Sequence, residues 1–480
     1  MGAELLQQYS SNDALRAELE STLALQRKAC LAHPVPTLAE RQADLRALAR
    51  FVRESKEEII AAICADYGNR SRHETLFAEI FTALDGVDHA LKHLKRWMKP
   101  RRRPVDWRNF PGATNRVVPQ PLGVVGVIVP WNFPLNLSIV PLIGIFAAGN
   151  RAMVKMSENS RHLAQLMRER MPAYFPREKL AIFDETGGVG IEFSRLPFDH
   201  LLFTGSSQTG RSVMAAAAQN LCPVTLELGG KSPAVVCEDY PLAKAAERIL
   251  FVKLFNAGQI CTTVDYLFLP EARIDAFVAL ARQLVPARYP RLDSADFTSV
   301  IDARAFRRIT AALADAEARG ATLVQLLPGE RWDESTRKIA PHLVLNMPHD
   351  CELATREIFG PVLPVYGYSS LEEVIDYVNA RPRPLALYPF SNDAARVQLL
   401  LDRVMSGGVS VNDALFHVAQ HDLPFGGVGA SGMGHYHGHE GFLTFSKLRP
   451  VFHQASFSPM KFLAPPYGRF ATVLLNFLTR

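Results

Sequence analysis

The sequence predicts an α/β protein in which two parallel-sheet units follow a helical N-terminal layer. The 480 residues exceed the size at which one hydrophobic core stops growing, so more than one domain is expected. Residues 12–98 carry apolar side chains at helical spacing, with charges between them. From residue 119 onward, short apolar runs alternate with helical segments, which is typical of parallel sheets covered by helices.

The helical layer is predicted over residues 1–98, and a linker over residues 99–118. The apolar positions of the layer follow one helical face and include Leu45, Leu48, Ala49, Val52, Ile59, Ile60 and Ile63. The linker contains the basic run Lys99-Pro100-Arg101-Arg102-Arg103. We interpret this run as a solvated connection; a nuclear-localisation or anionic-surface role is the alternative.

The first α/β unit is predicted over residues 119–225. Strands are expected over residues 123–129, 152–155, 179–184 and 200–204, and helices over residues 141–148, 162–171 and 209–220. Residues 117–150 carry no charge and are long enough to cross a bilayer, but they are interrupted by Pro121, Pro130, Pro134 and Pro141, with Asn132 and Asn136 between them. A buried strand, a loop and a buried helix explain this stretch better than a membrane span.

The second unit is predicted over residues 226–412, with the boundary near Leu226. Strands are expected over residues 232–237 and 264–269, and helices over residues 242–255, 274–284 and 371–380. Residues 413–445 form a glycine-rich segment. In the last part, residues 446–480, we expect an extended piece over 448–453 that joins a sheet edge. Its apolar tail over 470–478 is too short to span a membrane, which favours an amphipathic or oligomer-contact helix.

Composition narrows the class of protein. The net charge of +5 is small for this length and the basic residues are dispersed, so nucleic acid is not expected as a partner. Six scattered cysteines without CxxC spacing argue against a zinc cluster and a secreted disulfide framework, and they fit a cytoplasmic location. The first residues lack the pattern of a secretory signal.

Three residues together indicate acyl chemistry on an aldehyde. Cys261 and Glu227 each lie close to glycines, where the backbone can approach a substrate, and they match a thiol nucleophile and a carboxylate base. Asn132, between Trp131 and Phe133, offers an amide donor for a developing oxyanion. Taken singly, Cys261 is more often a buried inert thiol and Glu227 a solvated strand-end carboxylate.

Two glycine patterns resemble nucleotide fingerprints. Residues 427–432 satisfy GxGxxG, but they follow no clear strand and open no helix, so we do not interpret them as a dinucleotide site. Residues 205–212 follow a strand and open a helix, which suits a diphosphate; an ordinary capped helix start is the alternative. At the end of another strand, Lys155 and Glu158 are placed to reach ribose hydroxyls.

Three alternating histidines, His435, His437 and His439, have the spacing of ligands on a strand. The glycines beside them indicate a turn instead, and no cysteine lies near them in sequence. We therefore expect no metal site.

Several motifs, in this order, resemble the aldehyde dehydrogenase superfamily between about residues 100 and 450. They are Pro130-Trp131-Asn132-Phe133-Pro134, Phe203-Thr204-Gly205-Ser206, Leu226-Glu227-Leu228-Gly229-Gly230-Lys231-Ser232-Pro233, Asn256-Ala257-Gly258-Gln259-Ile260-Cys261 and Glu357-Ile358-Phe359-Gly360-Pro361-Val362. Residues 424–434 and 436–438 resemble the class 3 branch. With residues 412–420 and 434–442 they are most similar to bacterial coniferyl aldehyde dehydrogenases.

The resemblance implies an aldehyde dehydrogenase-like fold with two Rossmann-like parallel-sheet domains. Residues 119–225 would bind NAD or NADP, residues 226–412 would be catalytic, and residues 413–445 would return to the active site. The linker and residues 446–480 would form an oligomerisation extension of a homodimer without a transmembrane anchor. The implied reaction is the oxidation of a small-molecule aldehyde, aromatic or medium to long chain, to its acid. A cysteine-dependent thioesterase and a non-catalytic binding protein are the alternatives.

The resemblance also implies a role for each site residue. Cys261 would form a thiohemiacetal and then a thioester, Asn132 would stabilise the oxyanion, and Glu227 would activate the hydrolytic water. The cofactor would lie against Pro130, Trp131, Lys155, Glu158, Gly205, Ser206, Leu228, Gly229, Glu357 and Phe359.

Overall fold

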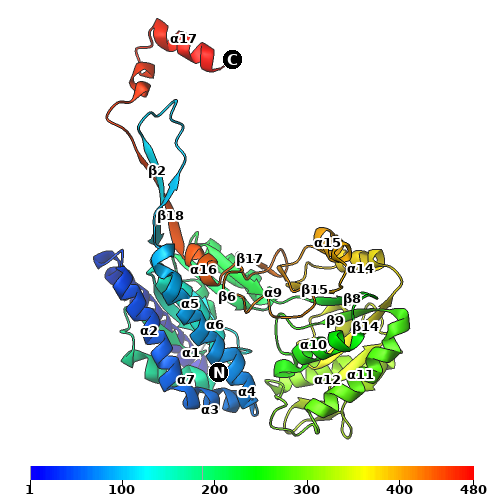
Figure 1. Cartoon of the computed structure of the whole chain (residues 1–480). Coiled ribbons are helices and arrows are strands. Elements are labelled where there is room, and N and C mark those ends of the chain that lie inside the picture. Colours follow the sequence, from blue (N-terminus) through cyan, green and yellow to red (C-terminus); the bar gives the residue numbers. More distant parts are fainter. Residues whose placement is uncertain (1, 186–187, 480) are drawn as a thin grey trace.

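The chain folds into two α/β bodies and a slender arm. The structure is a computed structural model that describes residues 2–185 and 188–479. The helical layer and the first sheet form one body, the second sheet forms the other, and the arm projects away from both (Figure 1). The expected α/β architecture is confirmed.

Most helices of the N-terminal layer cover one face of the first sheet, and the first helix of the layer packs on the other face. Their apolar face packs with β3, β4 and β6 in one core, which includes Leu45, Leu48 and Val52. The layer and the helix that packs on it comprise α1 (Gly2–Ala32), α2 (Leu38–Glu54), α3 (Lys56–Tyr67), α4 (Arg72–Thr75), the π-helix η1 (Leu76–Phe81), α5 (Thr82–Trp97) and α6 (Asn136–Ala148). A Thr37–Glu40 capping box starts α2. The predicted helical layer is thus present, and it begins earlier than residue 12.

The first sheet has six strands in the order β17-β7-β6-β3-β4-β5. All neighbours are parallel except β17. The strands are β3 (Val124–Ile128), β4 (Arg151–Lys155), β5 (Leu180–Phe183), β6 (His200–Gly205), β7 (Val224–Leu228) and β17 (Gly432–Met433). The connecting helices are α7 (Arg161–Arg170), η2 (Met171–Ala173), α8 (Val189–Ser194) and α9 (Ser207–Ala218). Helices α1, α8 and α9 pack in the core on the other face.

The second sheet has seven strands in the order β10-β13-β14-β9-β8-β15-β16. Its strands are β8 (Pro233–Val236), β9 (Tyr266–Pro270), β10 (Thr322–Gln325), β13 (His342–Leu345), β14 (Val362–Tyr368), β15 (Ala386–Phe390) and β16 (Gly408–Val409); β11 (Trp332–Asp333) pairs with β12 (Lys338–Ile339). The helices are α10 (Leu242–Leu254), η3 (Phe255–Gly258), η4 (Glu271–Arg273), α11 (Ile274–Arg288), α12 (Ala303–Ala318), α13 (Glu352–Thr355), α14 (Leu371–Asn379) and α15 (Ala394–Arg403). The boundary expected near Leu226 falls inside β7, so the chain crosses to the second sheet only after that strand.

The arm is a three-stranded antiparallel sheet. Two of its strands precede the first α/β sheet in the sequence, and the third follows the second α/β sheet. It contains β1 (Arg101–Arg103), β2 (Thr114–Pro121) and β18 (Ser446–His453) in that order. The extended segment expected over residues 448–453 is confirmed, and its edge partner is β2. The basic run interpreted as a linker is instead the edge strand β1, and its exposed arginines suit an edge that must not pair further.

Beyond the arm, the chain ends in η5 (Pro459–Leu463) and α17 (Arg469–Leu478). Helix α16 (Gly438–Thr444) precedes β18 and packs on α6. Among the described residues, no helix is both long and apolar enough to cross a membrane.

Candidate active site

The predicted site residues of the first sheet gather where its parallel strands end. Residues 130–132 follow β3, Lys155 ends β4, Ser206 follows β6, and Glu227 lies near the end of β7. Strand β3 lies between β4 and β6, so the connections leave it in opposite directions. In open α/β sheets, ligands bind beyond the carboxyl ends at such a switch point.

Cys261 reaches this edge from the second sheet through a strained turn. Asn256, Ala257 and Gly258 have φ values of 51°, 50° and 75°, all in the left-handed region. A Cβ on Gly258 would lie 2.3 Å from the carbonyl oxygen of Gly360, so only glycine fits there. The turn comes directly after α10 and ends at the nucleophile candidate. Strain of this kind is typical of functional sites.

The Cys261 thiol and the Glu227 carboxyl interact with each other, and Glu227 Oε1 is buried without a hydrogen-bond partner among the described residues. Burial raises the pKa of Glu227 to about 8, and the interaction with the thiol partly opposes that rise. Burial and the negative charges of Glu227 and Glu357 raise the pKa of Cys261 well above its ordinary value. The thiol is therefore protonated at rest, and the carboxyl beside it becomes a base only as the pH rises through about 8.

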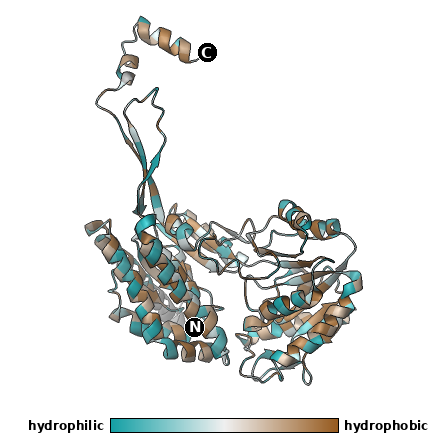
Figure 2. Cartoon of the chain, in the orientation of Figure 1, coloured by the Kyte–Doolittle hydropathy of each residue, from teal (hydrophilic) through white to brown (hydrophobic). Residues whose placement is uncertain are grey.

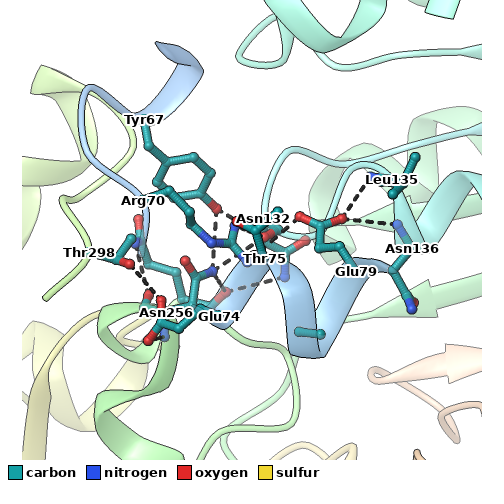
Figure 3. A network of polar contacts seen from close by, with 12 residues as sticks. Tyr67, Arg70, Glu74, Thr75, Glu79, Asn132, Leu135, Asn136, Asn256 and Thr298 are labelled. Carbon is teal, nitrogen blue, oxygen red and sulfur yellow. Dashed lines mark hydrogen bonds and ion pairs between the residues drawn. The ribbon is translucent and has the colours of Figure 1, made fainter. Parts of the chain in front are cut away.

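Asn132 lies beside the nucleophile turn, and its backbone carbonyl is held by a buried polar network (Figure 3). Its side-chain Nδ2 donates to the carbonyl of Gln259 at 3.3 Å. The Asn132 carbonyl accepts hydrogen bonds from the Tyr67 hydroxyl at 2.9 Å, from Arg70 Nη1 at 2.8 Å and from Asn256 Nδ2 at 3.3 Å. Residues of the helical layer thus fix the relative position of the amide and the turn.

A fully buried ion pair completes this network. Arg70 and Glu79 have no exposed side-chain surface, and Arg70 Nη2 lies 3.7 Å from Glu79 Oε1. The guanidinium also lies 4.8 Å from the ring centre of Tyr67 and 4.9 Å from that of Phe133. The other oxygen of Glu79 accepts from the backbone N–H groups of Leu135 and Asn136, where α6 begins. Burial raises the pKa of Glu79 to about 7, and the positive charge of Arg70 counteracts part of this rise.

Glu357 lies over the glycines that follow β7. A Cβ on Gly229 would come within 2.0 Å of Glu357 Oε2, so a larger residue there would displace the Glu357 carboxyl. The loop of Glu357 is anchored by Lys231, which pairs with Asp265 and donates to the carbonyl of Leu353 at 2.9 Å. Burial, then the charge of Asp265, raises the pKa of Glu357 to about 8. Its Oε1 is buried and has no hydrogen-bond partner among the described residues.

The remaining candidates for cofactor contact lie along the same edge. The indole of Trp131 meets the ring of Phe359 edge to face, with centres 5.3 Å apart. Ser206 caps α9, where its hydroxyl accepts from the Thr209 N–H. Lys155 is buried and pairs with Glu185.

Glu158 is exposed just beyond β4. The carboxylate that pairs with Lys155 comes from Glu185.

A mostly apolar cavity of about 190 Å³ opens beside Cys261. Its walls come from η1, α5, α6, η3 and residues 415–445. The aromatic part of the lining comprises Phe77, Phe81, Phe133, Phe255, Phe416, Phe425, Tyr436 and Phe445. Its shape and lining suit an elongated apolar or aromatic molecule.

Sequence reasoning missed the parts of the site that come from the helical layer and from α10. Tyr67, Arg70, Glu74 and Glu79 lie in segments whose only sequence signal was helical periodicity. Lys253 of α10 is 1% exposed, and its Nζ has no hydrogen-bond partner among the described residues. Burial lowers its pKa to about 8. Lys253 lies eight positions before Cys261. This closeness to the nucleophile in the sequence was the one signal that could have drawn attention to it.

Known proteins share this arrangement. The model of the aldehyde dehydrogenase family matches residues 9–451. The chain belongs to the aldehyde dehydrogenase family. A probable coniferyl aldehyde dehydrogenase of Pseudomonas aeruginosa is 49% identical over 94% of both chains. Staphylococcus aureus AldH, solved in a substrate-bound state, superposes with a TM-score of 0.89 at 33% identity, over 95% of this chain and 99% of that one.

A second solved relative is an aldehyde dehydrogenase of Mycobacterium tuberculosis in complex with NAD+. It superposes with a TM-score of 0.81 at 26% identity and covers 92% of this chain and 91% of that one. Membership of the aldehyde dehydrogenase family makes the chain an oxidoreductase that converts aldehydes to carboxylic acids. The resemblance drawn from the sequence motifs is confirmed.

Proposed function

We propose that this aldehyde dehydrogenase oxidises coniferyl-type aromatic aldehydes to their acids, with NAD or NADP as the hydride acceptor. The observation that carries the proposal is that Cys261, which interacts with the buried Glu227 carboxyl, lines an aromatic-walled cavity. The coniferyl aldehyde relative is 49% identical over nearly the whole chain, which supports the aromatic class. Medium and long-chain aliphatic aldehydes fit the apolar lining as second-best substrates.

The catalytic roles follow from the geometry of the pair. The Cys261 thiol loses its proton to water, and the thiolate attacks the aldehyde carbon to give a thiohemiacetal. The Asn132 amide and the Cys261 backbone N–H stabilise the oxyanion. Loss of hydride leaves a thioester on Cys261. Glu227 then removes a proton from the water that hydrolyses this thioester.

The residues along the sheet edge fit a nicotinamide dinucleotide. The orphaned Oε1 of Glu357 is an acceptor that a ribose hydroxyl would satisfy, and the capped N-terminus of α9 suits a diphosphate. When bound, the cofactor supplies the hydride acceptor. The residues assigned to hold it are Pro130, Trp131, Lys155, Glu158, Gly205, Ser206, Leu228, Gly229, Glu357 and Phe359.

Each segment takes a role in this proposal. Residues 119–225 bind the cofactor beneath the helical layer of residues 1–98, residues 226–412 supply the nucleophile, and residues 413–445 return to the site and line the cavity. The segments 99–118 and 446–480 carry the contacts of the oligomer.

The oligomer is a homodimer built on the arm. Helix α17 exposes the apolar side chains of Phe470, Val473, Leu475, Phe477 and Leu478. Ala471 of the same helix is buried. Figure 2 shows this helix as a largely hydrophobic element at the end of the hydrophilic arm. An apolar face of this kind is expected to pack on a second copy. Sedimentation should give a dimer for the full chain and a monomer after removal of residues 455–480.

A reducing cytoplasmic location completes the proposal. All six cysteines are free, as expected in a reducing compartment. Alkylation of freshly lysed cells should therefore label every accessible cysteine.

Product analysis tests the proposed activity. The purified protein is incubated with coniferyl aldehyde and either NAD+ or NADP+, and the acid is measured by chromatography. One acid should form per reduced cofactor. Hydrolysis of an aryl ester or thioester as the sole activity, with no reduction of NAD+ or NADP+ on addition of aldehyde, would establish the thioesterase alternative. The absence of turnover with any aldehyde would favour the other alternative, a non-catalytic binding protein.

A further inference from the structure

One wall of the cavity is polar, in contrast to the rest. Helix α5 lines the cavity with Asp85, Gly86 and His89, and His421 lines it beside them. Asp85 carries the one carboxylate among the lining residues that the structure describes. Asn136 Nδ2 donates to Thr82 Oγ1 at 2.5 Å. The Tyr436 hydroxyl and His89 Nε2 are buried and have no hydrogen-bond partner among the described residues.

Asp85 and His421 form an oriented pair. His421 Nε2 lies 2.8 Å from Asp85 Oδ2. A Cβ on Gly86 would lie 3.7 Å from His421 Cε1, so the imidazole rests against the glycine of α5. The ring of His89 stacks close by, with its centre 4.9 Å from that of His421. One oxygen of Asp85 is thus held by the imidazole, and the side chain remains half exposed at the cavity.

The pair and the reacting thiol border the same cavity. Cys261, Asp85 and His421 all line it, together with Tyr436 and His437. The ring of His437 stacks on that of Phe425. A substrate with its carbonyl at the thiol would extend its other end toward this pair.

We propose that Asp85, oriented by His421, accepts a hydrogen bond from the phenolic hydroxyl of a para-hydroxylated aryl aldehyde. This inference rests on the proposed function, and it names the chemical group that the cavity selects. Coniferyl aldehyde carries such a hydroxyl at the end opposite its aldehyde. An alkyl aldehyde brings only methylene groups to the pair and leaves the carboxylate without a donor, which costs affinity.

The test compares two aldehydes that differ in the donor alone. Both 4-hydroxycinnamaldehyde and 4-methoxycinnamaldehyde have an electron-donating para oxygen, but only the first has an O–H. The ratio of their kcat/KM values is measured for the wild type, for Asp85→Leu and for the control Asp88→Leu. Asp88 lies on the same helix, and its carboxylate faces solvent near Arg53. The control therefore removes a carboxylate from α5 without touching the cavity.

We expect the wild type and Asp88→Leu to prefer the hydroxylated aldehyde by about tenfold, because hydrogen bonds to charged groups are the stronger kind. Asp85→Leu should bring the ratio close to one, and His421→Phe should lower it in part. The assignment is wrong if the wild type shows no preference or if Asp85→Leu keeps it. Turnover of both aldehydes with equal kcat/KM would overturn this subsite alone, whereas turnover of neither would overturn the proposed function as well.

Discussion

Glu74 of the helical layer accepts a hydrogen bond of 2.8 Å from the backbone N–H of Asn256, the first residue of the left-handed turn before Cys261. Its other carboxylate oxygen accepts from the Thr298 hydroxyl at 2.5 Å. The carboxylate is buried, and burial raises its pKa. Glu74, a residue of the helical layer, therefore holds the strained turn, which belongs to the second α/β body.

Replacement of Glu74 by Gln should destabilise this turn. The glutamine side chain keeps one acceptor oxygen, which can serve only one of the two donors, Asn256 N–H and Thr298 Oγ1. Its NH₂ group faces the other donor, so one buried hydrogen bond to a charged group is lost. We expect the free energy of unfolding to fall by about 1.5–3 kcal/mol, and kcat to fall with KM little changed. Denaturant titration and steady-state kinetics measure both. The exposed Glu57→Gln should change neither quantity; equal behaviour of the two variants would contradict the role of Glu74.

Removal of Arg70 should leave a buried carboxylate without its counter-charge. Arg70→Met is expected to cost about 3–5 kcal/mol of stability. The double variant Arg70→Met/Glu79→Gln should recover a large part of that loss, because the orphaned charge is gone. Thermal unfolding of the single and double variants tests this coupling. If the second substitution destabilises the protein further, Arg70 and Glu79 are not coupled in the way that their geometry indicates.

The pH dependence of deacylation should follow Glu227. Its pKa is raised to about 8, so in the folded protein the carboxyl holds its proton below that pH and releases it above. A step that needs Glu227 as a base therefore speeds up as the pH rises through about 8. Glu227→Gln should slow thioester hydrolysis by at least about a hundredfold and abolish this rise. A Glu227→Gln profile that still rises near pH 8 would assign the base to another group.

Lys253 makes the stability of the folded protein depend on pH between about 8 and 10.5. Its pKa is lowered to about 8 in the folded protein, against an ordinary value of 10.5. Between these values the unfolded chain binds more protons than the folded one, so stability increases as the pH rises from about 8 to 10.5. Lys253→Met should remove this slope and raise the melting temperature at pH 7. An unchanged slope in the variant would show that another group titrates there.

The fold and the chemistry of the site were predictable from sequence for specific reasons. Buried parallel strands such as β3 and β6 are continuous apolar runs, and their ends carry the glycines and polar residues of the motifs. Short motifs fix Cys261, Glu227 and Asn132 because backbone conformation and chemistry coincide at those positions. Gly258 is an example, since its positive φ and the backbone packed against it leave no room for another residue.

The supporting shell was not predictable, because its members are remote in sequence and ordinary in type. Arg70 and Glu79 read as charges on an amphipathic helix, and only tertiary packing buries them completely. The pairing of Lys155 with Glu185 likewise depends on how two strand ends meet. The arm strand β1 was missed because three arginines next to prolines carry no β-strand signal.

The central claim is that Cys261 carries the acyl group and Glu227 releases it. Glu227→Gln is mixed with coniferyl aldehyde and NAD+, quenched in acid within one turnover, and mapped by peptide mass spectrometry. The account predicts one reduced cofactor per protomer and an acyl adduct on the peptide that contains Cys261. An adduct on another cysteine, or continued acid formation by Cys261→Ala, would contradict it.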